Sequence, residues 1–206
     1  GPLDRQSFVG SSVVLIDREE CRFFVKRYFS PRLSYALKDI FRPSKALKAW
    51  NAALLLSSFG FRTAPVVAAG ERRNVGLLAD AFLVTDEVRA LPVPDYVSTH
   101  FAGRRLTGEA LKKKRKLMKA LGEEVGRLHL TGILHGDLLP GNILIEEIDE
   151  SVNFFFLDND RTRRFLRTIP LKLVVRNLVQ LGRFPMPGIT LTDRLRFFQA
   201  YVKQNP

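Results

Sequence analysis

The sequence lacks the features that define several classes of protein. It has a single cysteine, so no disulfide can form within the chain, and a reducing compartment such as the cytoplasm is expected. No apolar run reaches the roughly eighteen residues of a membrane-spanning helix, and no signal-peptide pattern is present. The chain opens with Gly1-Pro2-Leu3, as a cleaved purification tag would, so a longer natural N-terminus is expected.

Acidic residues are scarce relative to basic ones. The chain has 33 Lys and Arg against 21 Asp and Glu, a net charge of +12 and an isoelectric point near 10.3. Such a surface attracts anionic lipid, phosphorylated sugars or nucleic acid. No aromatic and basic stripe is present to stack bases, so nucleic acid is not expected as a partner. The basic block 112–116 lies among apolar residues at helical spacing and is expected to be a solvated helix face.

The most informative segment is the run 135–142, because its last residue, Asn142, lies sixteen residues before Asp158. The run is His135-Gly136-Asp137-Leu138-Leu139-Pro140-Gly141-Asn142, and Asp158 closes the apolar stretch 154–157. Phosphoryl transfer needs one carboxylate to orient the acceptor hydroxyl and separate oxygen ligands to hold Mg²⁺ against the nucleotide phosphates. Asp137 fits the first role, and Asn142 and Asp158 fit the second. The spacing therefore predicts a kinase-like catalytic loop.

A hairpin is predicted to bring the two metal ligands to the same end. Residues 143–145 read as an apolar strand, residues 146–150 as a polar turn and residues 152–157 as the returning strand. The simpler alternative is that His-Gly-Asp forms an ordinary turn and that Asp158 begins a surface loop. Several independent matches in the right order favour the catalytic loop.

The remaining elements divide the chain into a β-rich first half and a mainly helical second half. Period-2 and helical patterns, with Gly60 as a helix stop, indicate where the elements lie. In the first half, strands are predicted at 12–16, 21–29, 65–69 and 77–85, and a helix at 44–58. In the second half, helices are predicted at 95–101, 107–131, 169–181 and 192–202.

This order predicts an α+β fold that is bilobal and protein-kinase-like. A nucleotide-binding N-lobe, residues 1–85, would hold a small antiparallel β-sheet with one helix. A mainly helical C-lobe, residues 86–206, would hold the catalytic loop. ATP would lie in the cleft, beside a hinge at residues 85–88.

Lys26 is the candidate for pairing with the nucleotide phosphates. It lies on the strand 21–29 and is expected to face the same side as Phe24 and Tyr28. Most lysines on such strands are simply solvated, as Arg27 is expected to be. The position of Lys26 in the first lobe, before the helix, favours the phosphate contact.

Four further residues are candidates for contacts with the nucleotide. Ser11 and Ser12 follow Gly10, and their backbone amides could cradle phosphate even though the loop has one glycine. Thr85 and Glu87 lie at the predicted hinge. Together with Lys26, these residues form the predicted ATP-binding set.

The sequence resembles the bacterial lipopolysaccharide core kinases, which phosphorylate Kdo or heptose, from about residue 11 to its end. The most specific likeness is the aspartate-any-aspartate-arginine ending of Leu157-Asp158-Asn159-Asp160-Arg161, because protein kinases have Asp-Phe-Gly at this point. The other matching segments are Phe24-Val25-Lys26-Arg27-Tyr28, Gly60-Phe61-Arg62-Thr63-Ala64-Pro65, Ala68-Ala69-Gly70-Glu71, Phe82-Leu83-Val84-Thr85, His135-Gly136-Asp137-Leu138 and Arg176-Asn177-Leu178.

The resemblance implies a role for each site residue. Asp137 would be the catalytic base, and Lys26 would contact the α and β phosphates. Asn142 and Asp158 would bind Mg²⁺. The supporting residues would be His135, which anchors the loop backbone, and Asp160 and Arg161, which support the site or face the acceptor.

The resemblance also implies an activity, which is ATP- and Mg²⁺-dependent transfer of the γ-phosphoryl group to a hydroxyl of a lipopolysaccharide core sugar. The partner would be an anionic glycolipid or phosphorylated sugar, and the enzyme would be cytoplasmic, with the inner-membrane surface as a further location. Two alternatives stay open: an atypical RIO-like protein kinase, and a noncatalytic pseudokinase or polyanion-binding scaffold. The scaffold is motivated by Ala49, where the family has a Glu to pair with Lys26, and by Phe24 in the expected adenine pocket.

Overall fold

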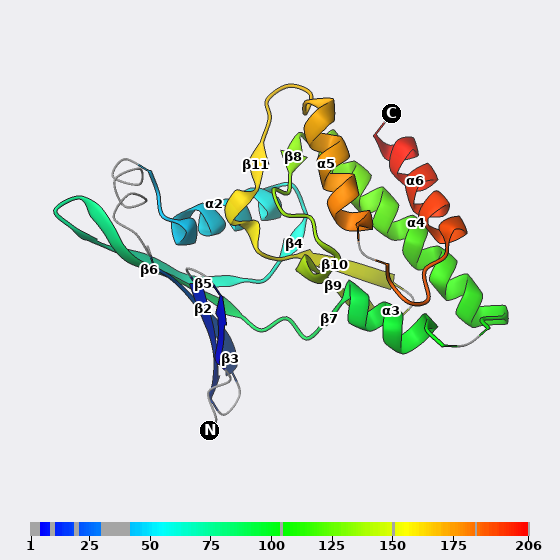
Figure 1. Ribbon diagram of the computed structural model, residues 1–206, viewed down its shortest axis with the longest axis horizontal. Coiled ribbons are helices and arrows are strands. Elements are labelled where there is room, and N and C mark those ends of the chain that lie inside the picture. The colour runs from blue at the N-terminus through cyan, green and yellow to red at the C-terminus, as the bar shows by residue number, and fades with distance from the viewer. Residues whose placement is uncertain are drawn as a thin grey trace. The chain divides into compact units, whose positions relative to one another are not determined.

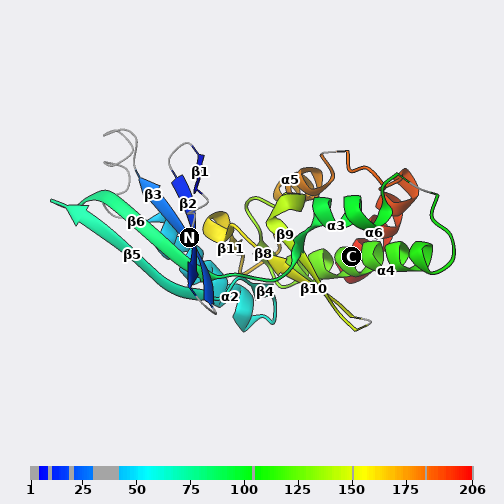
Figure 2. The ribbon, with the colours of Figure 1, turned by 90° about the horizontal axis from the view of Figure 1, so that it is seen from below.

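The chain forms two compact units, traced in Figures 1 and 2. The computed structural model describes residues 5–8, 11–18, 21–29, 42–103, 105–149, 151–183 and 185–205. The first unit comprises the described residues up to Ser58, then Thr63–Val88 and Asp158–Arg161, and the second comprises Phe59–Arg62, Arg89–Leu157 and the described residues from Thr162 on. Asp158 therefore belongs to the first unit, although it follows a strand of the second.

The first unit contains a five-stranded antiparallel sheet with the order β1-β2-β3-β6-β5. All four strands predicted for this half are confirmed, and β5 extends five residues beyond its predicted end. β1 was not predicted, because its four residues carry no clear alternation. The strands are β1 (Arg5–Phe8), β2 (Ser11–Arg18), β3 (Cys21–Phe29), β5 (Val66–Asn74) and β6 (Leu77–Asp86).

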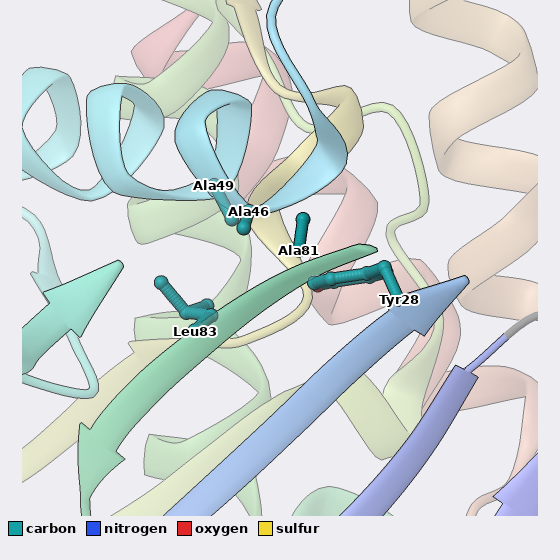
Figure 3. Packing of buried hydrophobic residues seen from close by; sticks show 5 residues of the cluster. All are labelled: Tyr28, Ala46, Ala49, Ala81 and Leu83. Atoms are coloured by element: carbon teal, nitrogen blue, oxygen red, sulfur yellow. The ribbon is translucent and has the colours of Figure 1, made fainter. Parts of the chain in front are cut away.

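Helix α2 (Lys45–Ser58) packs small residues against this sheet. Figure 3 shows alanines of α2 facing β6 and the ring of Tyr28 on β3. Methyl side chains let a helix approach a sheet closely, so Ala49 has a packing role at the position where a Glu was expected. The buried cluster consists of Tyr28, Ala46, Ala49, Ala81 and Leu83.

The second unit is mainly helical, as predicted. All four predicted helices are present, with ends within two residues of the predicted ones, and none of the described helices is long and apolar enough to cross a membrane. The helices are α3 (Val93–Phe101), α4 (Gly108–Leu130), α5 (Leu171–Gly182) and α6 (Leu191–Gln204).

The predicted hairpin is formed by β9 (Ile143–Ile148) and β10 (Ser151–Phe156). It belongs to a sheet with the order β4-β10-β9-β7, and a two-stranded sheet pairs β11 with β8. The amide of Leu157 donates to the carbonyl of Asn142 at 2.8 Å, so the pairing continues one residue beyond the hairpin. The short strands, which were not predicted, are β4 (Arg62–Thr63), β7 (Leu91–Pro92), β8 (Ile133–Leu134) and β11 (Arg163–Arg164).

Two glycines let α4 and α6 pack closely side by side (Figure 1). A Cβ atom at Gly122 would lie 2.3 Å from the carbonyl oxygen of Phe197, and one at Gly126 would lie 2.9 Å from that of Tyr201. Real Cβ atoms do not approach so near, so side chains at these positions would force the helices apart. The glycines thereby fix which face of α6 points toward α4.

Lys114 corrects the prediction that the block 112–116 is a solvated helix face. Its side chain is buried on α4, and its Nζ atom lies 2.7 Å from a carboxylate oxygen of Asp193 and donates to the carbonyl of Gly188 at 2.9 Å. Asp193 is also buried and forms a capping box with Thr190 at the start of α6. The paired carboxylate makes the burial of a lysine acceptable, and this pairing could not be read from the local pattern.

Gly122→Ala is expected to lower the free energy of unfolding by about 1–3 kcal/mol, because the added methyl group overlaps the backbone of α6. Gly182→Ala is the matched control, since the nearest atom to its Cβ would be 3.9 Å away, at the guanidinium of Arg194. Its stability should stay equal or rise with helix propensity. Urea unfolding followed by circular dichroism measures both variants, and equal effects would contradict the close packing.

Candidate active site

Lys26 of β3 contacts Asp158 within the first unit. Its Nζ atom donates a hydrogen bond to Oδ1 of Asp158 at 2.6 Å, and both side chains are partly exposed. The same atom lies 5.3 Å from the ring centroid of Tyr28, which confirms that these two residues share a face of the strand. Asp158 thus supplies the carboxylate that Ala49 does not provide for Lys26.

Asp158 has an unusual backbone conformation. Its φ of 56° lies in the left-handed region, which costs a non-glycine residue on the order of 1–3 kcal/mol. The other described non-glycine residues with positive φ are Val75 and Asp149, which lie in the hairpin turns after β5 and β9. Asp158 instead follows the end of β10. Strain of this kind is typical of functional sites, where the surrounding structure holds a side chain in place.

A second carboxylate, Asp160, lies close to Asp158. Burial raises the pKa of Asp160, and the negative charge of Asp158 raises it further, while Lys26 and Lys45 act in the opposite direction. Burial also raises the pKa of the Tyr28 hydroxyl, and both aspartates add to that shift. This part of the first unit therefore holds two carboxylates near two lysines. A bound cation would reduce the repulsion between the carboxylates.

His135 anchors the predicted catalytic loop in the second unit through both of its ring nitrogens. Its ring is fully buried, with Nε2 3.0 Å from the carbonyl oxygen of Leu157 and Nδ1 3.3 Å from the amide nitrogen of Asp137. A carbonyl only accepts and an amide N–H only donates, so Nε2 carries the hydrogen and Nδ1 accepts. The ring lone pair is therefore engaged by the loop backbone, which fits the anchoring role predicted for His135.

Asn142 holds the other side of the loop. Its Nδ2 atom donates to the main-chain oxygen of Asp137 at 2.9 Å, and the amide of Leu139 donates to the same oxygen at 2.8 Å. Because the side-chain nitrogen is a committed donor, Oδ1 is the atom of Asn142 that can bind a metal. Carboxylate and amide oxygens are ligands that Mg²⁺ prefers, so Asn142 and Asp158 fit this ion by their chemistry.

The Asp137 carboxylate accepts a hydrogen bond that the sequence did not predict. Nε2 of Gln180, on α5, donates to Oδ1 of Asp137 at 3.2 Å. Asn177, one turn earlier on α5, donates from Nδ2 to Oε1 of Gln180 at 3.0 Å and to the main-chain oxygen of His135 at 2.6 Å. Helix α5 therefore holds the predicted catalytic loop at the backbone of His135 and at the carboxylate of Asp137.

The hydrogen bonds continue from Asn177 to the C-terminal end of α6. His129 places Nε2 3.2 Å from Oδ1 of Asn177 and Nδ1 2.9 Å from the hydroxyl of Tyr201, and Nδ2 of Asn205 donates to that hydroxyl at 2.8 Å. The Tyr201 hydrogen therefore points to His129, whose Nε2–H donates to Asn177. Each member donates to the next in a relay that ends at Asp137, and the relay consists of Asn205, Tyr201, His129, Asn177 and Gln180.

The other predicted ATP-binding residues belong to the first unit. Ser11 begins β2 and Ser12 is buried in it, while Gly10 lies outside the described residues. Thr85 lies near the end of β6, and the amide of Glu87 donates to a main-chain oxygen of β3 at 2.9 Å. Their contacts with a nucleotide stay predictions.

The predicted site residues form one group in each unit. Lys26, Asp158 and Asp160 lie close together in the first unit, where the side chain of Arg161 is exposed. The loop residues His135, Asp137 and Asn142 lie together in the second. Coordination of one metal ion by both Asn142 and Asp158 stays a prediction.

The sequence did not predict Lys45 as a neighbour of Asp160, nor Gln180 and the rest of the relay that ends at Asp137. The inward spacing of Asn177, Gln180 and Leu181 on α5 was the one available signal, since these positions share a helix face.

Solved structures show that the chain has a kinase-like fold. The structure of WaaP in complex with acyl carrier protein matches with a TM-score of 0.73 and 21% identity, over 98% of this chain and 78% of that chain. The Rio2 kinase from Chaetomium thermophilum, in an ADP/Mg²⁺-phosphoaspartate complex, matches with a TM-score of 0.52 and 16% identity, over 98% of this chain and 70% of that chain. The predicted α+β, protein-kinase-like fold is confirmed.

The family follows from a second comparison. The model of the lipopolysaccharide kinase (Kdo/WaaP) family matches residues 32–201, most of the chain, so the protein belongs to that family. A probable bifunctional tRNA threonylcarbamoyladenosine biosynthesis protein from Methanoculleus marisnigri is 37% identical over 75 residues. That match covers 34% of this chain, which spans only 14% of the length of that protein.

His129 is expected to make folding stability fall as the pH drops below about 6.5. Burial lowers the pKa of His129 below its ordinary value of about 6.5. The unfolded chain then binds a proton that the folded chain excludes, so the stabilisation is complete above about pH 6.5 and is lost as pH falls toward the folded pKa. Urea unfolding at a series of pH values below 7 measures this effect. The free energy of unfolding should depend less on pH in His129→Gln than in the unaltered protein, and an unchanged dependence would contradict the assignment.

Proposed function

We propose that this protein is an ATP- and Mg²⁺-dependent kinase that transfers the γ-phosphoryl group to a hydroxyl of a lipopolysaccharide core sugar, Kdo or heptose. The observation that carries the proposal is the Asp137 carboxylate, held by Gln180 in a loop that Asn142 and His135 fix from both sides. Such fixed orientation suits phosphoryl transfer, where catalysis rests on positioning and charge neutralisation. Family membership supports the class of acceptor.

Asp137 acts as the base in the proposed reaction. Its Oδ1 atom accepts from Gln180, so Oδ2 is assigned to the acceptor hydroxyl. The hydroxyl proton passes to Asp137, the acceptor oxygen bonds to the γ-phosphorus, and the bond to the leaving ADP breaks. The relay limits rotation of the carboxylate, because turning it would break the bond from Gln180.

Lys26, Asp158 and Asn142 bind the nucleotide and its metal in this proposal. Mg²⁺ would neutralise charge on the β and γ phosphates when bound. Oδ1 of Asn142 and the carboxylate of Asp158 are its proposed ligands. Lys26 would exchange its bond to Asp158 for the α and β phosphates.

The basic surface supports an anionic glycolipid or phosphorylated sugar as the acceptor. Three exposed arginines follow the segment 158–161, namely Arg163, Arg164 and Arg167. We place the protein in the cytoplasm and peripherally on the inner membrane, where a lipid-linked core sugar would be available to it.

Asp137→Asn is expected to lower turnover by about 10²–10⁴-fold, because the amide cannot accept the proton. Folding and the thermal stabilisation by ATP and Mg²⁺ should be nearly unchanged. Labelled ATP with a panel of truncated core glycolipids, and with a protein acceptor, measures transfer. Asp149→Asn, in an exposed turn, is the matched control and should retain full activity. Full turnover in Asp137→Asn would remove the proposed role, and transfer to protein alone would favour a protein kinase.

Lys26→Met is expected to lower kcat/KM for ATP by about a hundredfold, because a positive charge aimed at the phosphates is lost. Arg27→Met is the control on the same strand, since Arg27 is exposed and pairs with Asp80. It should leave the kinetics unchanged. Initial rates at varied ATP concentration compare the two variants, and equal losses would argue against a phosphate contact by Lys26.

Absence of thermal stabilisation of the unaltered protein by ATP and Mg²⁺ would favour the noncatalytic scaffold.

A further inference from the structure

Helix α6 carries a row of large apolar side chains on its outer face. Leu191, Leu195, Phe198 and Val202 are 83%, 52%, 51% and 42% exposed. Their spacing of four, three and four residues places them along one side of the helix, over about 17 Å. The opposite side is the one that packs on α4, where Ala200 and Tyr201 are buried. The outer row is therefore not part of the core of this unit.

Such a row is unusual for a surface helix. Single exposed apolar residues are common, but contiguous rows mark places that contact a partner or a membrane. Rotation of α6 cannot hide the row, since Gly122 and Gly126 of α4 fix the inner face by their close approach to α6. The buried pair of Lys114 with Asp193 fixes its first turn as well.

The exposed charge in the stretch of chain that contains the row is of one sign. Residues 161–206 contain ten Lys and Arg and a single acidic residue, Asp193, so +9 of the net +12 lies in this stretch. Asp193 is buried and paired with Lys114 at 2.7 Å and with Arg196 at 3.1 Å. No carboxylate side chain of the described part of this stretch is therefore exposed to solvent.

Helix α5 has the same character. Leu171, Val175 and Val179 are exposed at four-residue spacing, and the helix contains no acidic residue. Lys172 and Arg176 lie beside this row and are exposed. Two helices of one unit thus combine apolar rows with exposed basic side chains, which is the composition of helices that lie in a membrane interface.

We propose that the outer face of α6 docks the protein on an anionic lipid surface. The apolar row enters the boundary between headgroups and acyl chains, and the basic side chains lie among the lipid phosphates. A protein partner would need a groove matched to the row, whereas a fluid bilayer takes in side chains from a convex helix. The inference rests on the proposed function in one respect, since a lipid-linked acceptor explains why such a kinase docks on lipid.

Vesicle cosedimentation tests the proposal with the whole chain. Phosphatidylcholine vesicles with phosphatidylglycerol should bind the protein, and phosphatidylcholine vesicles alone should bind it far more weakly. Leu191→Ser combined with Leu195→Ser should weaken binding to the anionic vesicles by about tenfold or more, because two inserted apolar side chains are lost. Leu54→Ser is the matched control, a leucine 59% exposed on α2, and it should bind as the unaltered chain does.

Four outcomes would overturn the docking surface. They are unchanged binding by the double variant, equal binding to the two vesicle types, retention on immobilised polyglutamate as strong as on anionic vesicles, and a dimer in solution that dissociates in the double variant.

Phosphoryl transfer to a lipid-free core oligosaccharide is measured in parallel. Transfer that fails while docking persists contradicts the function alone, and docking that fails while transfer persists contradicts only the surface. Asp137→Asn should bind vesicles normally.

Discussion

The hydrogen bonds of Asn177 are the interaction on which the proposed catalytic centre depends. This fully buried side chain donates to the backbone of His135 and to Gln180, and it accepts from His129. Buried polar networks are strong when each member is satisfied and costly when one is not. The orientation of the Asp137 carboxylate therefore depends on Asn177, which holds Gln180 and the backbone of His135.

Much of the fold could be predicted from the sequence, because the long elements have clear periods. Helix α4 was predicted to within one residue at each end, since its apolar stripe extends over several turns. The two-residue strands β7, β8 and β11 could not be, because two residues carry no period. They arise from tertiary pairing, as that of β11 with β8 shows.

The site divides in the same way. Asp137, Asn142 and Asp158 could be proposed from the sequence because the chemistry of phosphoryl transfer needs particular side chains at particular intervals, and their roles stay predictions. Gln180 and Tyr201 could not be, since they contact Asp137 and His129 across 43 and 72 residues of sequence. The burial of Lys114 was missed for the same reason, because its carboxylate partner Asp193 lies on a different helix.

Helix α6 takes part in two features of the second unit, one on its inner side and one on its outer side. Tyr201 and the following Asn205 supply the start of the relay, and the row that includes Phe198 faces outward. A contact on the outer row would act on the same helix that carries Tyr201 and Asn205. If docking of α6 favours the ordered relay, thermodynamic reciprocity requires that a ligand favouring the same orientation of the Asp137 carboxylate strengthen the docking by the same factor.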